Sequence, residues 1–408
     1  MTMNTTLLES LSGRIAGHVK DVPRSGIRDF FDIVSEMPDI ISLGIGEPDF
    51  DTPKHILDAA VSRLRNGATH YTSNLGLTKT REALVGYVKK TFGFECDPET
   101  EMLLTVGVSE AVDLAIRALI NPGDEVLYHE PCYVSYQPLI SMAHGVPVAV
   151  TTFPEDDFRL TREHLEAKVS ERTKALLLNF PNNPTGAILL RKDLEDIAAF
   201  ACEHDLIVIS DEIYAELTYD GEHVSIASLP GMMERTIFLH GMSKAWAMTG
   251  FRMGYACAPA PLIDAMMKIH QYTMLCSPVL GQEAAIEALR NPEEDIAVMR
   301  NEYRRRRDVL TNAFMEMGLP CSTPAGAFYA FPCIAGLNIS AYDFAMRFIE
   351  EHAVAVVPGT AFGEAGKGFL RCSYAASIED LREAMSRMAI FVDTLRREAG
   401  FAAGVSPV

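Results

Sequence analysis

The chain has 408 residues, of which 48% are hydrophobic and 22% are charged, and its formal net charge is −19. This length allows about two or three domains, and the composition is that of an ordinary globular protein rather than a disordered one. The negative charge argues against nucleic acid and against anionic membranes as partners, because their phosphates would be repelled.

Eight cysteines are scattered along the chain without a C-x-x-C pair. This spacing argues against both a disulfide framework and a metal site, so no metal is expected. The N-terminus lacks a basic region followed by an apolar stretch, and no apolar run approaches the length of a membrane-spanning helix. A cytoplasmic protein is therefore expected.

A tight loop over residues 44–48, with two glycines and a proline, precedes two predicted helices. The first is expected to begin with Thr52 as its cap and Pro53 at its first helical position. The second is predicted over residues 79–91. Along the first helix an apolar stripe is expected to face the core; it consists of Ile56, Leu57, Ala60, Val61 and Leu64.

From residue 102 onward, apolar runs alternate with amphipathic helices such as the one predicted over residues 194–202. This alternation is typical of an α/β fold in which helices cover both faces of a mostly parallel sheet. Seven strands are expected, over residues 102–106, 125–128, 146–150, 175–179, 206–210, 236–239 and 254–257.

Residues 279–317 are predicted to form one or two long helices, broken near Asn291-Pro292. Four adjacent arginines, residues 304–307, lie on the second part. On a helix they point around most of the circumference, and acidic neighbours balance them. We interpret them as a solvated helix face rather than as a nucleic-acid site.

The pattern along the chain predicts three parts. Residues 1–45 form an N-terminal arm, with a short helix around residues 27–36, that joins the small domain. Residues 46–290 form the large domain, and residues 291–408 form a smaller α+β domain with a loose tail from Gly400.

Polar or glycine-containing segments follow four of the predicted strands directly. Strand ends of the same polarity lie along one edge of a parallel sheet, where ligands bind, so these segments are expected to meet at one site. They are Gly107-Val108-Ser109-Glu110, Phe180-Pro181-Asn182-Asn183-Pro184-Thr185-Gly186, Asp211-Glu212-Ile213-Tyr214 and His240-Gly241-Met242-Ser243-Lys244.

The residue types in these segments suit a phosphorylated aldehyde. Lys244 lies among small and apolar neighbours, where an amine loses its proton more readily and becomes a nucleophile. Arg252, between Gly250 and Gly254, can approach a phosphate closely and bind it with two hydrogen bonds. The helix start at residues 107–109 offers free backbone amides to the same anion.

Residues 241–254, GMSKAWAMTGFRMG, resemble the pyridoxal-phosphate attachment signature of the class I and II aminotransferases of fold type I, of the aspartate and aromatic aminotransferase kind. The resemblance covers roughly residues 25–395. It implies a large domain with a mostly parallel seven-stranded sheet and a smaller α+β domain. It also implies that Lys244 carries pyridoxal 5'-phosphate as a Schiff base and is the catalytic residue.

The resemblance assigns further roles residue by residue. Asp211 would pair with the ring nitrogen, Tyr133 would stack on the ring, and Arg371 would bind the substrate α-carboxylate, with Gly46 contacting substrate through its backbone. Tyr71 would reach the phosphate in the neighbouring subunit, which implies a homodimer. The implied cofactor-binding residues are Tyr71, Val108, Ser109, Tyr133, Asn183, Asp211, Tyr214, Ser243, Lys244 and Arg252, and the substrate-binding ones are Gly46, Asn183 and Arg371.

Two positions depart from the family pattern. Gly241 stands where some relatives have a serine hydroxyl on the phosphate, a loss that Ser243 or Ser109 could offset. Ser109 stands where certain aspartate-specific relatives carry a lysine for the distal carboxylate, which weakens a strictly aspartate-specific assignment.

The predicted function is transfer of an amino group from an L-amino acid to a 2-oxo acid such as 2-oxoglutarate. Aspartate, aromatic and broad donor specificities stay open. A C–S lyase or a decarboxylating synthase would use the same lysine, so both remain alternatives. A non-catalytic regulator is disfavoured, because the roughly 45 residues before the first loop are too few for a DNA-binding module.

Overall fold

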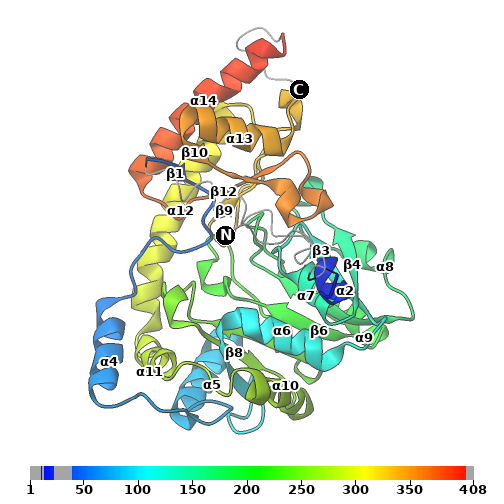
Figure 1. Cartoon of the computed structure of the whole chain (residues 1–408), viewed down its shortest axis with the longest axis vertical. Helices are drawn as coiled ribbons and strands as arrows, with labels where there is room; N and C mark the ends of the chain where they lie inside the picture. The colour runs from blue at the N-terminus through cyan, green and yellow to red at the C-terminus, as the bar shows by residue number, and fades with distance from the viewer. Residues whose placement is uncertain (1–10, 12, 23–38, 401–408) are drawn as a thin grey trace.

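The computed structural model describes residues 11, 13–22 and 39–400, so the helix predicted over residues 27–36 and most of the predicted loose tail lie outside the described residues. A large domain with a central sheet lies below a smaller domain (Figure 1). The strands of the large sheet are β2 (Met102–Val106), β3 (Glu125–Glu130), β4 (Val146–Thr151), β5 (Thr173–Asn179), β6 (Ile207–Asp211), β7 (Thr236–Gly241) and β8 (Met253–Cys257).

All seven predicted strands are confirmed, and they form one sheet in the order β2-β8-β7-β6-β5-β3-β4. β8 pairs antiparallel with both of its neighbours, β2 and β7, whereas the other four pairings of the sheet are parallel. β2 and β7 therefore run in the same direction. The predicted mostly parallel sheet is thus confirmed.

Both faces of this sheet are buried under helices, which explains why its strands read as continuous apolar runs. Along β7, Phe238 packs on the side of α5, and its neighbour Leu239 packs on the opposite side with α6. The helices of the large domain are α4 (Lys54–Arg65), α5 (Thr78–Phe92), α6 (Gly107–Leu119), α7 (Tyr136–Met142), α8 (Arg162–Glu166), α9 (Arg191–Glu203), α10 (Ala260–Thr273) and α11 (Val279–Ala288).

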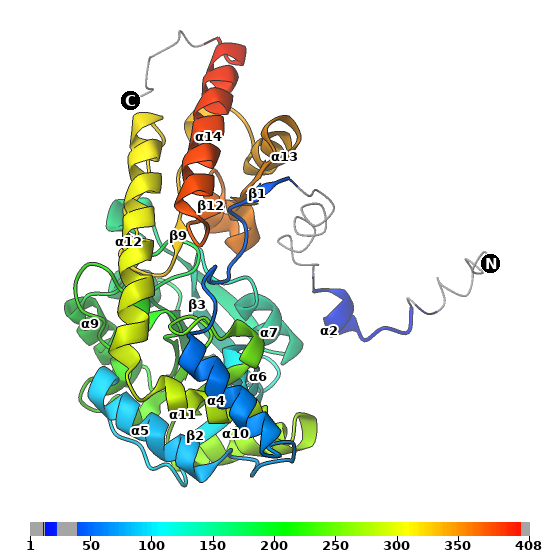
Figure 2. The same cartoon turned by 90° about the vertical axis from the view of Figure 1, so that its left-hand side faces the viewer.

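The small domain combines short strands with three long helices. In Figure 2, α12 runs from the large domain into the small one, where it packs beside α14. The proposed boundaries at residues 45/46 and 290/291 fall just after β1 and just before α12. The elements are β1 (Ile41–Ser42) paired with β10 (Val354–Ala355), the sheet of β9 (Tyr329–Ala330), β11 (Val357–Pro358) and β12 (Leu370–Ser373), and α12 (Pro292–Glu316), α13 (Ala341–His352) and α14 (Ile378–Glu398).

The predicted cap of the first helix is wrong. α4 begins at Lys54 with Pro53 as the residue before it, and the hydroxyl of Thr52 donates instead to the carbonyl of Ala247 at 2.7 Å. The hydroxyl of Thr52, which the local sequence predicted to cap the helix, is therefore bonded to a residue close to Lys244 and distant in the sequence. The predicted stripe is buried only at Ile56 and Ala60.

The four arginines of α12 are not all on a solvated face, and that interpretation is wrong for two of them. Arg306 and Arg307 are buried. Arg306 Nη1 donates to both carboxylate oxygens of Asp49 at 2.8 Å, and Arg307 Nη1 donates to the carbonyl of Pro324 at 3.0 Å. Because α12 packs against both domains, adjacent positions on it meet different partners rather than water.

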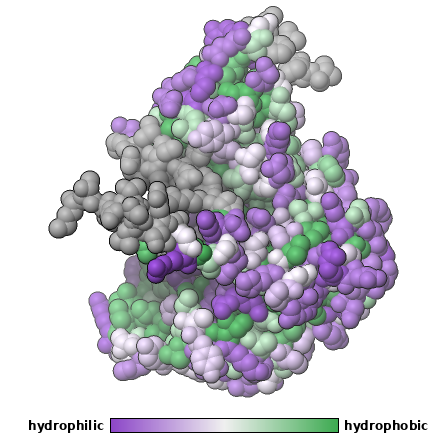
Figure 3. Space-filling model, turned by 45° about the vertical axis from the view of Figure 1, so that its right-hand side comes forward, coloured by the Kyte–Doolittle hydropathy of each residue, from purple (hydrophilic) through white to green (hydrophobic). Residues whose placement is uncertain are grey.

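On the face shown in Figure 3, hydrophilic side chains dominate and hydrophobic ones form smaller patches between them. Within the described ranges, no helix is both long and apolar enough to cross a membrane.

Candidate active site

An open cavity of about 1310 Å³ lies between the carboxyl ends of the large sheet and the small domain. All the predicted site residues except Tyr71 line it. They are Gly46, Val108, Ser109, Tyr133, Asn183, Asp211, Tyr214, Ser243, Lys244, Arg252 and Arg371.

Strand direction explains why these residues meet. β2, β5, β6 and β7 run the same way, so the segments that follow them lie along one edge of the sheet. β8 runs in the opposite direction, so its first residue lies at that same edge. Arg252, which immediately precedes β8, is therefore brought beside Lys244, which follows β7.

Lys244 is half-buried in the cavity wall. Its Nζ donates to the carbonyl of Gly46 at 2.6 Å and lies 5.5 Å from the ring centroid of Phe328. Burial lowers the pKa of this amine to about 8. A larger fraction of the amine is therefore neutral near physiological pH than for an exposed lysine, as a nucleophile requires.

Arg252 and the start of α6 form an anion-binding end of the cavity. The backbone of Arg252 is left-handed (φ 52°), and its Nη1 donates to the carbonyl of Thr249 at 3.1 Å. A Cβ on Gly107 would lie 2.6 Å from Arg252 Nη2, so the guanidinium sits directly against the first residue of α6. Free amides at a helix start and a guanidinium together suit a phosphate.

Three glycines let the backbones at this end approach one another closely. Gly241 pairs with Gly254 across β7 and β8. A Cβ on Gly254 would lie 2.4 Å from the carbonyl carbon of Gly107, and one on Gly241 would lie 2.7 Å from the carbonyl oxygen of Met253. The side chain of a serine at position 241 would therefore collide with this backbone.

Asp211, the last residue of β6, is buried in the cavity wall. Its Oδ2 accepts from the hydroxyl of Tyr136 at 2.8 Å, and its backbone carbonyl accepts from Asn179 Nδ2 at 3.0 Å. Burial raises the pKa of Asp211 to about 6, which the hydrogen bond from Tyr136 opposes. A buried carboxylate at this position suits a partner that brings a positive charge or a proton.

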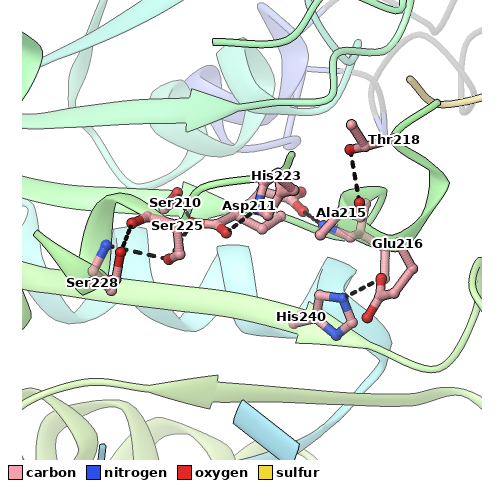
Figure 4. A network of polar contacts seen from close by, with 12 residues as sticks. Ser210, Asp211, Ala215, Glu216, Thr218, His223, Ser225, Ser228 and His240 are labelled. Carbon is pink, nitrogen blue, oxygen red and sulfur yellow. Dashed lines mark hydrogen bonds and ion pairs between the residues drawn. The ribbon is translucent and has the colours of Figure 1, made fainter. Parts of the chain in front are cut away.

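A buried polar network holds the segment that follows β6. Glu212 Oε1 accepts from the hydroxyls of Ser210 at 2.8 Å and Ser225 at 2.9 Å. Figure 4 shows His240 of β7 bonded to Glu216, with 3.0 Å between His240 Nε2 and Glu216 Oε2. Neither carboxylate lines the large cavity, so this network anchors the segment of Asp211 and Tyr214 from behind.

Arg371 of β12 lies at the small-domain side of the cavity. Its Nη1 donates to Asn183 Oδ1 at 3.0 Å, and its Nη2 donates to the carbonyl of Gly44 at 2.5 Å. The guanidinium carbon lies 4.6 Å and 4.7 Å from the ring centroids of Tyr329 and Phe362. Its Nε is buried without a hydrogen-bond partner among the described atoms. Arg371 lines the cavity, and its planar guanidinium suits a carboxylate there.

Tyr133 and Tyr71 lie in contrasting places. Tyr133 lines the cavity, and its ring meets that of Tyr136 edge-on at 5.5 Å. Tyr71 is 82% exposed and does not line the cavity of its own chain. Its loop is held to the end of α10 by the side chain of Asn74, which donates to the carbonyl of Leu275 at 2.6 Å.

Three residues of the site were missed from the sequence. Asn179 ends β5, and a polar residue at a strand end is a sequence signal from which it could have been predicted. Tyr136 has no such signal, because its sequence context is that of an ordinary core aromatic residue. Tyr329 comes from the small domain, and its hydroxyl lies 2.9 Å from that of Tyr214. No local pattern links residues so far apart in the chain.

The donor set fits pyridoxal phosphate. Arg252 and the start of α6 suit its phosphate, the buried amine of Lys244 suits its aldehyde, and the buried carboxylate of Asp211 suits its ring nitrogen. The guanidinium of Arg371, at the small-domain side of the cavity, suits the substrate carboxylate.

Comparisons with known proteins agree with this geometry. A family model, "Aminotransferase class I and II", matches residues 38–388. An aspartate aminotransferase of Pyrococcus abyssi is 49% identical over 89% of this chain and 94% of its own. An aromatic-amino-acid aminotransferase of Thermococcus litoralis is 46% identical over 92% of this chain and 97% of its own. The solved structure of an aromatic aminotransferase from Pyrococcus horikoshii superposes with a TM-score of 0.86 at 46% identity, covering 92% of this chain and 100% of that one. The chain belongs to the class I and II aminotransferases and is a pyridoxal-phosphate-dependent enzyme.

Proposed function

We propose that the enzyme transfers the amino group of an aromatic or acidic L-amino acid to 2-oxoglutarate. The relatives from Pyrococcus abyssi and Thermococcus litoralis, named for aspartate and for aromatic amino acids, support this range of donors. Ser109 in place of a lysine supports a range that is not restricted to aspartate. The scattered cysteines support a cytoplasmic location.

In this proposal the cofactor phosphate is bound by Arg252, Ser243 and the start of α6 at Val108 and Ser109. The ring is held by the groups that line the middle of the cavity: Asp211 at its nitrogen, Tyr214 and Asn183 at its hydroxyl oxygen, and Tyr133 on its face. When bound, the cofactor supplies a pyridine ring that accepts electrons from the substrate Cα.

The observation that carries the proposal is the position of the Lys244 amine in the cavity wall, hydrogen-bonded to the carbonyl of Gly46 and beside the ring of Phe328. Desolvation there lowers the pKa of the amine to about 8. Its Nζ binds the cofactor before substrate arrives. Once released, the same Nζ takes the proton from the substrate Cα as a general base. It then acts as a general acid and passes this proton to the cofactor. The hydrogen bond to the carbonyl of Gly46 keeps it in the cavity meanwhile.

Arg371 orients the substrate. Its planar guanidinium binds the α-carboxylate with two parallel hydrogen bonds, in part by exchanging its present contacts with Asn183 and Gly44. Gly46 contacts the substrate through its backbone. A Cβ at that position would lie 2.8 Å from the hydroxyl of Tyr329, so only glycine fits there without a shift.

We further propose a homodimer in which Tyr71 binds the phosphate at the neighbouring subunit's site. The exposure of Tyr71 on its own chain supports this, because a tyrosine 82% exposed has most of its ring free for another surface.

The first test is a donor screen on the purified holoenzyme. We expect aspartate and aromatic amino acids to convert the bound cofactor stoichiometrically to its amine form, and 2-oxoglutarate to reverse the change in the absorption spectrum. Lys244→Ala should lower the turnover rate at least about a thousandfold, since it removes both nucleophile and proton carrier. Lys268→Ala is the matched control, because Lys268 is exposed on α10.

Two results would contradict the proposal. Release of pyruvate and ammonia from cysteine-type substrates, without formation of the amine form, would indicate a C–S lyase instead. Borohydride reduction followed by peptide mapping should place the fixed cofactor on Lys244, and a label on another residue would refute its assignment.

A further inference from the structure

Tyr136 lies behind the cofactor site and takes no part in the roles proposed above. Its ring is buried at the start of α7, and its hydroxyl donates to Asp211 Oδ2 at 2.8 Å. Burial and the adjacent Asp211 raise the pKa of the phenol well above its usual value, so it stays protonated and acts as a donor at all working pH values. Within the described part of the chain, no other side chain donates to this carboxylate.

Two donors fix the plane of the Asp211 carboxylate. Tyr136 binds Oδ2, and the backbone amide of Ile213 donates to Oδ1 at 3.2 Å. An ionised carboxylate has about four acceptor positions. Since Asp211 also lines the cavity, the remaining positions are available to a donor there.

The same tyrosine supports the neighbouring aromatic residue. The amide of Tyr136 donates to the carbonyl of Tyr133 at 3.2 Å, forming a turn at the start of α7. The two rings meet edge-on, with centroids 5.5 Å apart and planes at 80°. Tyr136 thus contacts both residues assigned to the cofactor ring, the one at its nitrogen and the one on its face.

We propose that Tyr136 is a positioning residue for transamination: its phenol keeps the Asp211 carboxylate ionised and turned toward the ring nitrogen of pyridoxal phosphate. This inference rests on the proposed role of Asp211. A carboxylate without this donor binds a proton of its own more readily, and a protonated Asp211 stabilises a protonated ring nitrogen poorly. The ring would then accept electrons less well.

The test compares apo-protein binding of pyridoxal phosphate with binding of its carbocyclic analogue, in which a C–H group replaces the ring nitrogen. We expect Tyr136→Phe to weaken binding of pyridoxal phosphate about tenfold and that of the analogue less than twofold, because the analogue presents no N–H to Asp211. In the wild type, the preference for pyridoxal phosphate should fall as the pH drops through about 6, where Asp211 takes up a proton. In Tyr136→Phe this fall should begin at a higher pH.

Tyr128→Phe is the matched control. Tyr128 lines the same cavity and its hydroxyl donates to a carboxylate, that of Glu130 at 2.8 Å, but not to Asp211. Its substitution should leave the ratio of the two dissociation constants and its pH dependence unchanged.

The outcomes separate the two assignments. Equal losses for cofactor and analogue in Tyr136→Phe, with an unchanged pH dependence, would overturn the inference and indicate a merely structural tyrosine. If Asp211→Asn weakens binding of pyridoxal phosphate more than binding of the analogue and Tyr136→Phe does not, only the role of Tyr136 is wrong. If Asp211→Asn also weakens the binding of both ligands equally, the proposed role of Asp211 is itself wrong.

Discussion

Two residues of the site are held in protonation states that burial disfavours. Burial lowers the pKa of Lys244 to about 8 and raises that of Asp211 to about 6, so each charged form is less stable here than in water. Both shifts lower the stability of the protein without its cofactor at neutral pH. A cofactor that neutralises or pairs these groups offsets the cost, which links cofactor binding to folding stability.

Asp211→Asn should therefore stabilise the apo-protein. Because the folded-state pKa of Asp211 is about 6 and its usual value is 3.8, the folded protein holds this proton more tightly, and its stability falls as the pH rises between these values. At pH 7 the substitution should raise the free energy of unfolding by on the order of 2–3 kcal/mol. The gain should disappear below about pH 4. Denaturant unfolding at several pH values measures it.

Asp196→Asn on α9 is the control for this stability measurement. Asp196 is exposed, so its substitution should change the free energy of unfolding by less than about 0.5 kcal/mol. An Asp211→Asn apo-protein that is less stable than the wild type at pH 7 would show that the carboxylate is not destabilising in the folded state.

At the scale of elements, the phosphate end depends on backbone contact between β8 and the start of α6. Gly254 of β8 lies against Gly107 and Val108 with no room for a side chain between them. This contact sets the distance between Arg252, just before β8, and the first amides of α6. The anion site is therefore a consequence of strand and helix packing rather than of one loop.

Gly254→Ala should move these elements apart. Its Cβ would lie 2.4 Å from the carbonyl carbon of Gly107 and 2.6 Å from the amide nitrogen of Val108, and neither backbone atom can rotate away. We expect a loss of about 1–3 kcal/mol in the free energy of unfolding, as for other overpacked sites. Weaker binding of pyridoxal phosphate should accompany it, measured by titration of the apo-protein.

Gly250→Ala is the matched control for this packing argument. Gly250 lies on the other side of Arg252, and a Cβ there would meet no atom within 4 Å. It should retain both the stability and the cofactor affinity of the wild type. If the two substitutions had the same effect, close packing at Gly254 would not be the cause.

At the scale of the whole molecule, the proposed homodimer predicts that two inactive variants complement each other. Lys244→Ala removes the amine of a site, and Tyr71→Ala removes the phosphate contact that a subunit offers to its neighbour. A mixed dimer would contain one site with both groups intact. Co-refolding equal amounts should therefore restore about a quarter of the wild-type number of sites, since half of the randomly paired dimers are mixed.

The complementation is measured as amino-transfer activity of the mixture against each variant refolded alone. Activity of the mixture equal to the mean of the two separate variants would show that Tyr71 acts within its own subunit or not at the site. A Tyr342→Ala and Lys244→Ala mixture serves as the control, because Tyr342 lines the cavity of its own chain.

The sequence alone determined the large sheet and much of the site. The seven strands are readable because a parallel sheet covered on both faces requires continuous apolar runs, and all of them except the edge strand β4 are largely buried. The position of Lys244, Asp211 and Asn183 at strand ends followed from the same rule, since parallel strands present their carboxyl ends at one edge. The direction of β8 was not readable, yet it is what brings Arg252 to that edge.

Only the tertiary structure decided which polar side chains are paired and with what. Arg306 and Arg307 resemble surface arginines because helical periodicity shows where a side chain points but not what packs there. Thr52 resembles a helix cap, but its hydroxyl donates to the carbonyl of Ala247, just after Lys244. Tyr136 resembles a core residue until Asp211, 75 positions along the chain, lies beside it. Local patterns encode burial and direction, whereas a hydrogen-bond partner depends on how distant segments fold against each other.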